Sequence, residues 1–239
     1  MTWSIVAHDP VTGALAVAVA TRAFAVGASC PFVRSGVGAV STQSMTNKYL
    51  GPAILDGLAR GLAPATAIEG ALAGDDGKHL RQVHAVDVLG RFAAWTGKHC
   101  VEWCGDSGAA HVSVAGNMLA GPDVVATTLA TYLAGGELAL PDRLMQAMDA
   151  GEAAGGDRRG RQSAAMVMTT SEDFPDLDIR VDDHVSPLVE LRRLLSIWTA
   201  FGPDRKAWSP CRANPSGMTD IDAIEAAWSK QAIELRFRR

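Results

Sequence analysis

The sequence lacks any apolar run of about 18 residues, the length that a membrane-spanning helix requires. It also lacks a basic segment followed by an apolar core near residue 1, so no secretory signal is expected. Basic residues are too few for a nucleic-acid-binding surface, because 22 Lys and Arg stand against 26 Asp and Glu, a net charge of −4. These absences predict a cytoplasmic protein that binds neither membranes nor nucleic acids.

Cysteine is scarce, and the sequence contains no nucleotide-binding motif. Four cysteines in 239 residues are too few for a disulfide scaffold. Cys100, Cys104 and His111 have a loose spacing with no second cysteine pair, so buried free thiols are favoured over a zinc site. No Gly-x-Gly-x-x-Gly follows the first strand, and no phosphate loop ending in Gly-Lys-Ser/Thr occurs. We therefore expect neither a metal nor a cofactor.

The remaining pattern predicts an α+β protein. Expected strands span residues 2–8, 14–21, 36–43, 82–88, 91–96, 110–115, 162–168 and 177–183. Expected helices span residues 49–60, 64–73, 122–134, 141–153, 187–201 and 221–235. The strands are apolar on both faces and lie between pairs of helices, which predicts a four-layer αββα sandwich with two stacked, mainly antiparallel sheets. Residues 1–201 would form this domain. Residues 202–239 would be a C-terminal extension, irregular to about residue 220 and packed on the same domain.

Thr2 is the first candidate for chemistry. Threonine is small enough for the initiator Met1 to be removed, which would leave a hydroxyl and a free α-amine on one residue. The α-amine titrates at about pH 8, so it can accept the hydroxyl proton and make Thr2 a complete nucleophile. No Ser-His-Asp spacing elsewhere offers a rival. The alternative is an ordinary first residue of a strand.

Several segments resemble one bacterial family, domain of unknown function 1028. They are TWSIVAHDPVTGALAVAVATRAFAVGA, GVGAVSTQ, YLGPAILDGL, GGDRRGRQSAA and IRVDDH. The resemblance runs from residue 2 to about residue 201. It implies a fold like that of the N-terminal-nucleophile (Ntn) hydrolases, the αββα sandwich, with no assigned substrate. Homo-oligomers are common for this fold, so a homo-oligomer is expected.

A looser likeness to proteasome β-subunits sharpens the candidates. Those proteins also open with Thr and two antiparallel strands that end near an Arg, here Arg22. They place an acidic residue just before that Arg, where this chain has Ala20, and a lysine near the third strand, where the nearest cation is Arg34. Arginine stabilises charge but does not exchange its proton at neutral pH. The likeness therefore supports the fold more than the mechanism.

Two residues besides Thr2 are candidates for the catalytic site. Arg22 would steady the nucleophile or a substrate carboxylate; the alternative is an ordinary ion pair. Asn117, next to Gly116, offers an amide donor for an oxyanion; the alternative is a turn asparagine.

Two polar groups are candidates for substrate binding, together with Arg34. Residues 41–44 are polar on an otherwise apolar strand, so Thr42 and Gln43 require partners, either a loop backbone or a ligand. The second group lies in a glycine-rich loop, where arginines can clamp a carboxylate; the alternative is a salt-bridged loop or an oligomer contact. Its members are Asp157, Arg158, Arg161, Gln162 and Ser163.

Three functions remain open from the sequence. In the first, Thr2 attacks the carbonyl of a small amide or peptide, and water releases the acyl-enzyme. The second is a non-catalytic binding or assembly protein that keeps the fold, which Ala20 and the missing lysine favour. The third is an enzyme that works through another pocket, such as the loop at residues 157–163. The sequence does not decide whether the protein is an enzyme.

Overall fold

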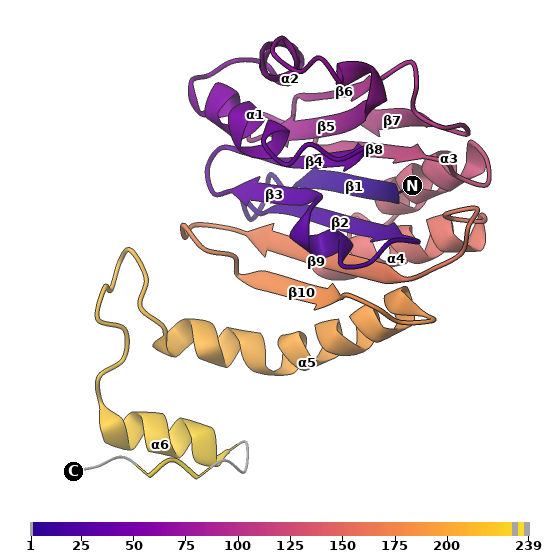
Figure 1. The fold of residues 1–239 in the computed structure, drawn as a ribbon. Coiled ribbons are helices and arrows are strands. Elements are labelled where there is room, and N and C mark those ends of the chain that lie inside the picture. The colour runs from indigo at the N-terminus through magenta and orange to yellow at the C-terminus, as the bar shows by residue number, and fades with distance from the viewer. Residues whose placement is uncertain (1, 231–233, 237–239) are drawn as a thin grey trace. The chain divides into compact units, whose positions relative to one another are not determined.

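A computed structural model describes residues 2–230 and 234–236, except for the side chains of residues 203–205. The chain divides into two compact units, Met1–Ser196 and Ile197–Arg239. The first unit holds both sheets (Figure 1). Within the second, Asp220 accepts a hydrogen bond from the Ala223 amide at the start of helix α6 (Ile221–Ser229). The helix predicted at residues 221–235 thus begins as expected, and its predicted end includes residues 231–233, outside the described residues.

The larger sheet has six antiparallel strands in the order β10-β9-β2-β1-β8-β7. Strand β1 is central, and each of its residues is buried, as the apolar sequence predicts. The turn between β1 and β2 is closed by Gly13, whose φ of 74° favours glycine. The strands are β1 Thr2–His8, β2 Leu15–Thr21, β7 Gly105–Ala109, β8 Val112–Asn117, β9 Ser163–Thr169 and β10 Leu177–Val181.

The smaller sheet has four antiparallel strands in the order β3-β4-β5-β6. They are β3 Pro31–Arg34, β4 Gly38–Ser44, β5 Arg81–Asp87 and β6 Phe92–Thr96. The sequence did not predict β3 or β7. Both are edge strands, where pairing with one neighbour tolerates the leading proline of β3 and the two glycines of β7.

Each sheet is covered by a pair of helices (Figure 1). Helices α1 (Leu50–Ala59) and α2 (Pro64–Leu72) bury Ile54 and Ile68 against the outer face of the smaller sheet. Helices α3 (Asp123–Ala134) and α4 (Leu140–Ala153) pack against the larger sheet. There the Trp3 side chain lies so close to α4 that a Cβ at Gly151 would be 2.9 Å from Trp3 Nε1.

The remaining helices of the first unit are two short 3-10 helices, η1 (Val26–Ala28) and η2 (Lys78–Leu80), and the beginning of helix α5 (Pro187–Trp208), which continues into the second unit. The prediction that α5 ends at residue 201 was wrong. The Gly-Pro pair at 202–203 resembles a helix stop, yet the backbone continues as helix to Trp208. Among the described residues, no helix combines the length and the hydropathy needed to span a bilayer.

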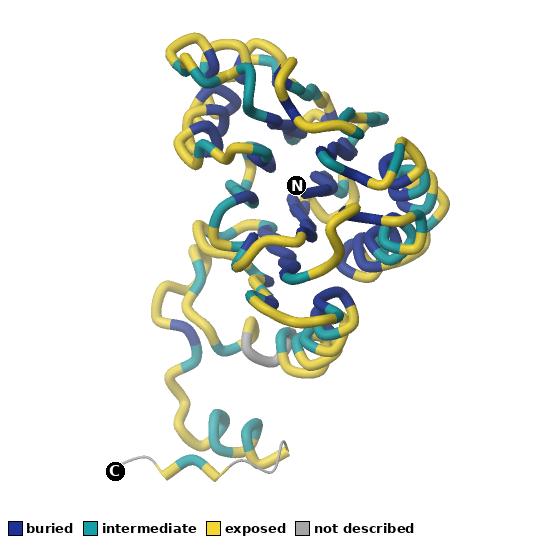
Figure 2. The backbone as a smooth tube through the Cα atoms, turned by 45° about the vertical axis from the view of Figure 1, so that its right-hand side comes forward, coloured by how far each residue is buried: buried dark blue, intermediate teal, exposed yellow. Residues whose placement is uncertain are grey.

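The space between the two sheets is divided into an apolar and a polar part. Side chains alternate along a strand, so Thr2, Ser4, Val6 and His8 of β1 share the face that meets the smaller sheet. Around Val6 the interior is an apolar cluster of Val6, Leu15, Val17, Ala39, Val86 and Val167. Around Ser4 it is polar, although these strands are as deeply buried as the rest (Figure 2).

Candidate functional site

A row of four polar side chains crosses the end of the larger sheet at the start of β1. The strand register places Thr2 beside Asn117 on one side and Thr21 on the other, and Thr21 beside Ser163. The Thr2 hydroxyl donates to Thr21 Oγ1 at 3.3 Å, and Asn117 Nδ2 lies 3.5 Å from the Thr2 carbonyl oxygen. Thr2 is 6% exposed. The structure thus brings together Thr2, Asn117 and Ser163, which the sequence nominated separately.

A buried polar network lies between the sheets, below Thr2. Ser4 Oγ is 2.9 Å from Ser41 Oγ, 2.8 Å from Gln43 Oε1 and 2.7 Å from His84 Nε2. The other ring nitrogen of His84 lies 3.0 Å from Ser113 Oγ. Burial lowers the pKa of His84 to about 3, so its ring is neutral at physiological pH. The network is therefore built from hydroxyls, amides and one neutral imidazole.

Gln82 connects this network to Asn117. Its Oε1 accepts hydrogen bonds from Gln43 Nε2 and Asn117 Nδ2, both at 2.9 Å. Its Nε2 donates to the Gly116 carbonyl at 2.8 Å and to Thr96 Oγ1 at 3.0 Å. These partners fix which end of the Gln82 amide faces Asn117, and so fix which end of the Asn117 amide faces Thr2.

The polar residues 42 and 43 find their partners within the protein. Gln43 is fully buried, and its Nε2 also donates to the Ala115 carbonyl at 3.1 Å. Thr42 points to the opposite face of β4 and donates to the Asn47 carbonyl at 3.2 Å. Of the two partners that the sequence left open, loop backbone is the one observed for Thr42. For Gln43 the partners are Ser4 and the Ala115 carbonyl in the facing sheet and Gln82 in the neighbouring strand β5.

The loop before β9 is organised around the buried carboxylate of Asp157. Its Oδ2 accepts from the Arg22 amide at 2.7 Å, and its Oδ1 accepts from the Arg159 amide at 2.9 Å. The Arg159 guanidinium forms an ion pair with it at 3.1 Å. A backbone bridge joins Asp157 to Leu119 in the loop after β8. Asp157 therefore ties together the ends of β2, β8 and β9 around the Thr2 row.

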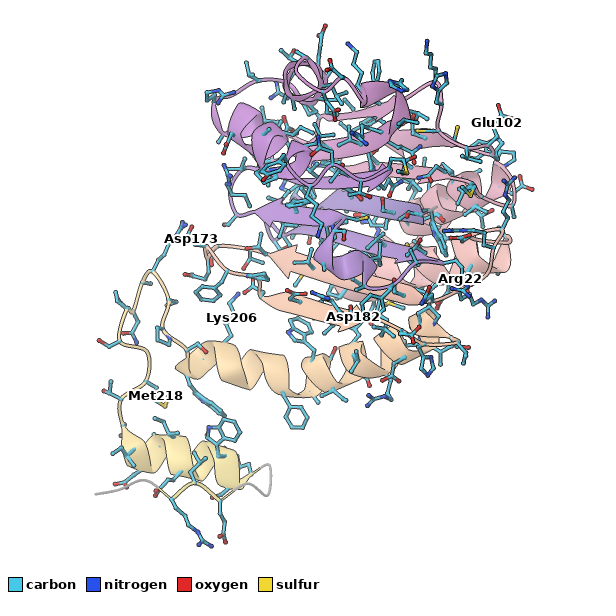
Figure 3. The ribbon with its side chains drawn as sticks, viewed as in Figure 1. Arg22, Glu102, Asp173, Asp182, Lys206 and Met218 are labelled. Atoms are coloured by element: carbon cyan, nitrogen blue, oxygen red, sulfur yellow. The ribbon has the colours of Figure 1, made fainter. Side chains whose placement is uncertain are left out.

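Arg22 directly follows the end of β2, next to Thr21 (Figure 3). Its Nη1 donates to Gln162 Oε1 at 2.7 Å, and Gln162 Nε2 donates to Asp183 Oδ1 at 3.1 Å. The Ser163 hydroxyl donates to the Ala23 carbonyl at 2.6 Å and accepts from the Val26 amide at 3.1 Å. The side chain of Ser163 thus holds the backbone that follows Arg22.

A cleft of about 400 Å³ opens between the loops after β8 and before β9. Arg161 forms an ion pair with Glu152 across it, and burial raises the pKa of Glu152. The lining residues are Ala120, Glu152, Gly155, Asp157, Arg158, Gly160 and Arg161. Three of the five loop residues predicted to bind substrate therefore line one cavity beside the Thr2 row.

Arg34 is placed away from this group. It pairs with Asp56 at 2.9 Å on the surface, and its strand partner Gly38 lies at the end of β4 remote from Gln43. Among the described residues, no group of three or more His, Cys, Asp or Glu side chains is arranged to hold a metal.

The sequence reasoning missed most of the buried network. Ser4, Gln82, His84 and Ser113 are each a polar residue in a strand whose other residues are largely apolar. Together with Ser41 and Gln43 of β4, the signal was therefore present in four strands. It could be combined only by knowing that β1, β4, β5 and β8 face one another.

Comparison with known proteins gives a family and a related structure. The model of the family of unknown function (DUF1028) matches residues 2–191. The crystal structure of protein SPO2555 from Silicibacter pomeroyi is 30% identical, with a TM-score of 0.85 over 92% of this chain and 96% of that chain. Anbu (ancestral beta-subunit) from Yersinia bercovieri is 12% identical, with a TM-score of 0.38 over 83% of this chain and 97% of that chain. No curated protein matches. By the family match and the overlap with SPO2555, this chain belongs to the family of unknown function DUF1028.

Proposed function

We propose that this protein is an Ntn-type amidohydrolase that cleaves a small amide or peptide bond, with Thr2 as nucleophile after removal of Met1. The observation that carries the proposal is the position of Thr2. Its hydroxyl lies on the first residue of a central strand, on the face between the sheets, 3.3 Å from the Thr21 hydroxyl. The rest of the proposal follows the chemistry that an N-terminal threonine supplies.

In this mechanism the α-amine of Thr2 takes the hydroxyl proton as Oγ1 attacks the substrate carbonyl. The resulting ammonium gives the proton to the leaving amine, and the acyl group stays on Oγ1 as an ester. Water, deprotonated by the same amine, then attacks the ester. The acid product leaves, and the proton returns to Oγ1. The cycle consumes one water and needs no other co-reactant.

Asn117 is the proposed donor to the oxyanion. One hydrogen of its amide is used by Gln82 Oε1 at 2.9 Å, while the 3.5 Å separation from the Thr2 carbonyl is long for a hydrogen bond. The second hydrogen of the Asn117 amide is therefore available to donate to a negative charge that develops beside Thr2. Gln82 would act as a positioning residue, because it fixes the orientation of that amide.

The same proposal assigns the two helix-covered sheets to the four-layer αββα arrangement of the Ntn type. It also retains a domain of residues 1–201 with an extension at 202–239, a cytoplasmic homo-oligomer, and no cofactor. A non-catalytic binding or assembly protein is the second candidate. It is favoured by Ala20, at the position that is acidic in proteasome-type sites, and by Arg34, which is paired with Asp56 away from Thr2.

The test joins an intact mass with a covalent probe. A β-lactone acylates a nucleophilic hydroxyl by ring opening, so the adduct carries the whole lactone mass. Protein purified at native level should lack one methionine and gain one lactone. Thr2→Ser should retain labelling, and Thr2→Ala should lose it. A retained Met1, or equal labelling of Thr2→Ala, would instead support the non-catalytic candidate or another site.

A further inference from the structure

We propose that the cleft between residues 118–121 and 155–161 binds a carboxylate, so that the substrate is an N-acyl amino acid or a short peptide with a free carboxyl group. This inference rests on the proposed function of Thr2 and narrows its substrate class. Three features support it: the positive charge of arginines that no carboxylate among the described residues of the cleft neutralises, the location of the cleft near Thr2, and its volume.

The charge of the cleft is unbalanced. Of the arginines in the loop, Arg159 is paired with Asp157, and Arg161 is paired with Glu152. Arg158 lines the cleft and is exposed, and within the described part of the chain no carboxylate pairs with its guanidinium. Because the acidic groups of the cleft already have partners, the positive charge of Arg158 is available to an anionic ligand.

Arg22 adds a second cation at the border of the cleft. A Cβ at Gly160 would lie 3.9 Å from Arg22 Cδ, so the Arg22 side chain passes beside a lining residue. Its guanidinium bonds to the neutral amide of Gln162, and the Asp183 carboxylate stands beyond that amide. Arg22 is therefore only partly compensated, and this cluster is basic on a protein whose net charge is −4.

Glycine lets the two loops form this cleft. Gly155 and Gly160 have φ values of 113° and 107°, which residues with a side chain rarely adopt. A Cβ at Gly155 would lie 2.6 Å from the Ala120 Cβ, so only glycine allows the loops to approach this closely. The two glycines therefore allow the backbone conformation that forms the cavity, and Arg158 is one of the residues that line it.

The location relates the cleft to the reacting atoms. One cleft loop follows the end of β8, where Asn117 pairs with Thr2, and the other precedes the start of β9, where Ser163 pairs with Thr21. A volume of about 400 Å³ is at the small end of the range for ligand sites. A scissile carbonyl at Thr2, with the carboxylate of the leaving amino acid a few bonds away, suits this arrangement, whereas a large or cationic substrate does not.

Binding can be measured without turnover in the Thr2→Ala variant. We would titrate it with N-acetylglycine and with the neutral N-acetylglycinamide at millimolar concentration, followed by saturation-transfer NMR. N-acetylglycine should bind and the amide should not. Adding Arg158→Gln should weaken binding about tenfold, as expected for loss of a charge-assisted hydrogen bond. The matched control is Arg60→Gln, which removes an exposed arginine at the end of α1 and should change nothing.

The outcomes separate this inference from the proposed function. Equal binding of the two probes, no binding of N-acetylglycine, or equal effects of Arg158→Gln and Arg60→Gln would overturn the carboxylate site. β-Lactone labelling of wild-type protein reports on Thr2 independently. If the β-lactone labels Thr2 but the two probes bind equally, the carboxylate site is refuted and the proposed hydrolase is not. Carboxylate binding without labelling removes the hydrolase and leaves an anion-binding cleft. Circular dichroism of each variant checks that the fold is retained.

Discussion

The neutral ring of His84 should make the stability of this protein fall in mild acid. Burial lowers the pKa of His84 from 6.5 to about 3, because burial of the whole ring disfavours the charged form and the ring nitrogens lie beside the Ser4 and Ser113 hydroxyls. Below pH 6.5 the unfolded chain therefore binds a proton at this ring that the folded chain does not bind. Stability is full above that pH and is lost as the pH falls towards the folded pKa.

The size of the effect follows from the two pKa values. Each pH unit between them removes about 1.4 kcal/mol from the free energy of unfolding, so lowering the pH from 6.5 to 5 removes about 2 kcal/mol. That is a large part of a typical total of about 5–15 kcal/mol. His8, whose pKa is also lowered, by burial and then by His111, adds to the loss with the same sign.

The assay is urea unfolding at pH 7, 6 and 5 with circular dichroism detection. His84→Gln keeps an amide donor and acceptor in place of the ring but cannot titrate. Its pH-dependent loss should be smaller than that of the wild type by about 2 kcal/mol, whatever its stability at pH 7. His99→Gln, at an exposed position, should behave as the wild type does. An unchanged pH dependence in His84→Gln would refute the reasoning.

Two further substitutions probe the surroundings of Thr2. Gly151→Ala would bring a Cβ into steric overlap with Thr128 Oγ1 and within 2.9 Å of Trp3 Nε1, so it should cost about 1–3 kcal/mol in a thermal or urea melt. Gly70→Ala, an open helix position, should be neutral or stabilising, and equal effects of the two substitutions would contradict the close packing around Gly151. Asp157→Asn should lower the free energy of unfolding by about 2–3 kcal/mol, because two backbone amides and a guanidinium lose a charged acceptor. The control Asp182→Asn removes one partner of a half-exposed ion pair and should cost less than about 1 kcal/mol. A larger loss in Asp182→Asn than in Asp157→Asn, measured by urea melts, would show that Asp157 does not organise the loop.

Much of the fold was accessible from local sequence. The nearly continuous apolar residues at 2–8 and 14–21 identified the central hairpin, because both of its faces are buried. Proline at position 64 marked the start of α2. Edge strand β7 was not predictable from its composition, because Gly-Asp-Ser-Gly-Ala has no apolar pattern and becomes a strand only by pairing with β8.

The site was predictable in its parts but not in its arrangement. Thr2, Asn117 and the loop at 157–163 each stood out by residue type, and the strand register brings them to one edge. The buried network was missed because its hydrogen bonds join positions far apart in the chain, such as Ser4 with His84. Arg34 was nominated because it lies near the third predicted strand in the sequence. It lies on an edge strand, where a charged side chain pairs more readily with a surface residue such as Asp56 than with a buried group.

The two sheets differ in how they can assemble during synthesis. The smaller sheet and its helices come from one continuous segment, Pro31–Thr96, while the larger sheet joins strands from residues 2–21, 105–117 and 163–181. Contacts close in sequence form faster, so we expect the smaller sheet to form before the larger sheet is complete. In that intermediate state the inner face of the smaller sheet exposes Ser41, Gln43, Gln82 and His84 to water. The polar side chains that later lie under Thr2 would thus protect the nascent chain from aggregation before they take part in any site.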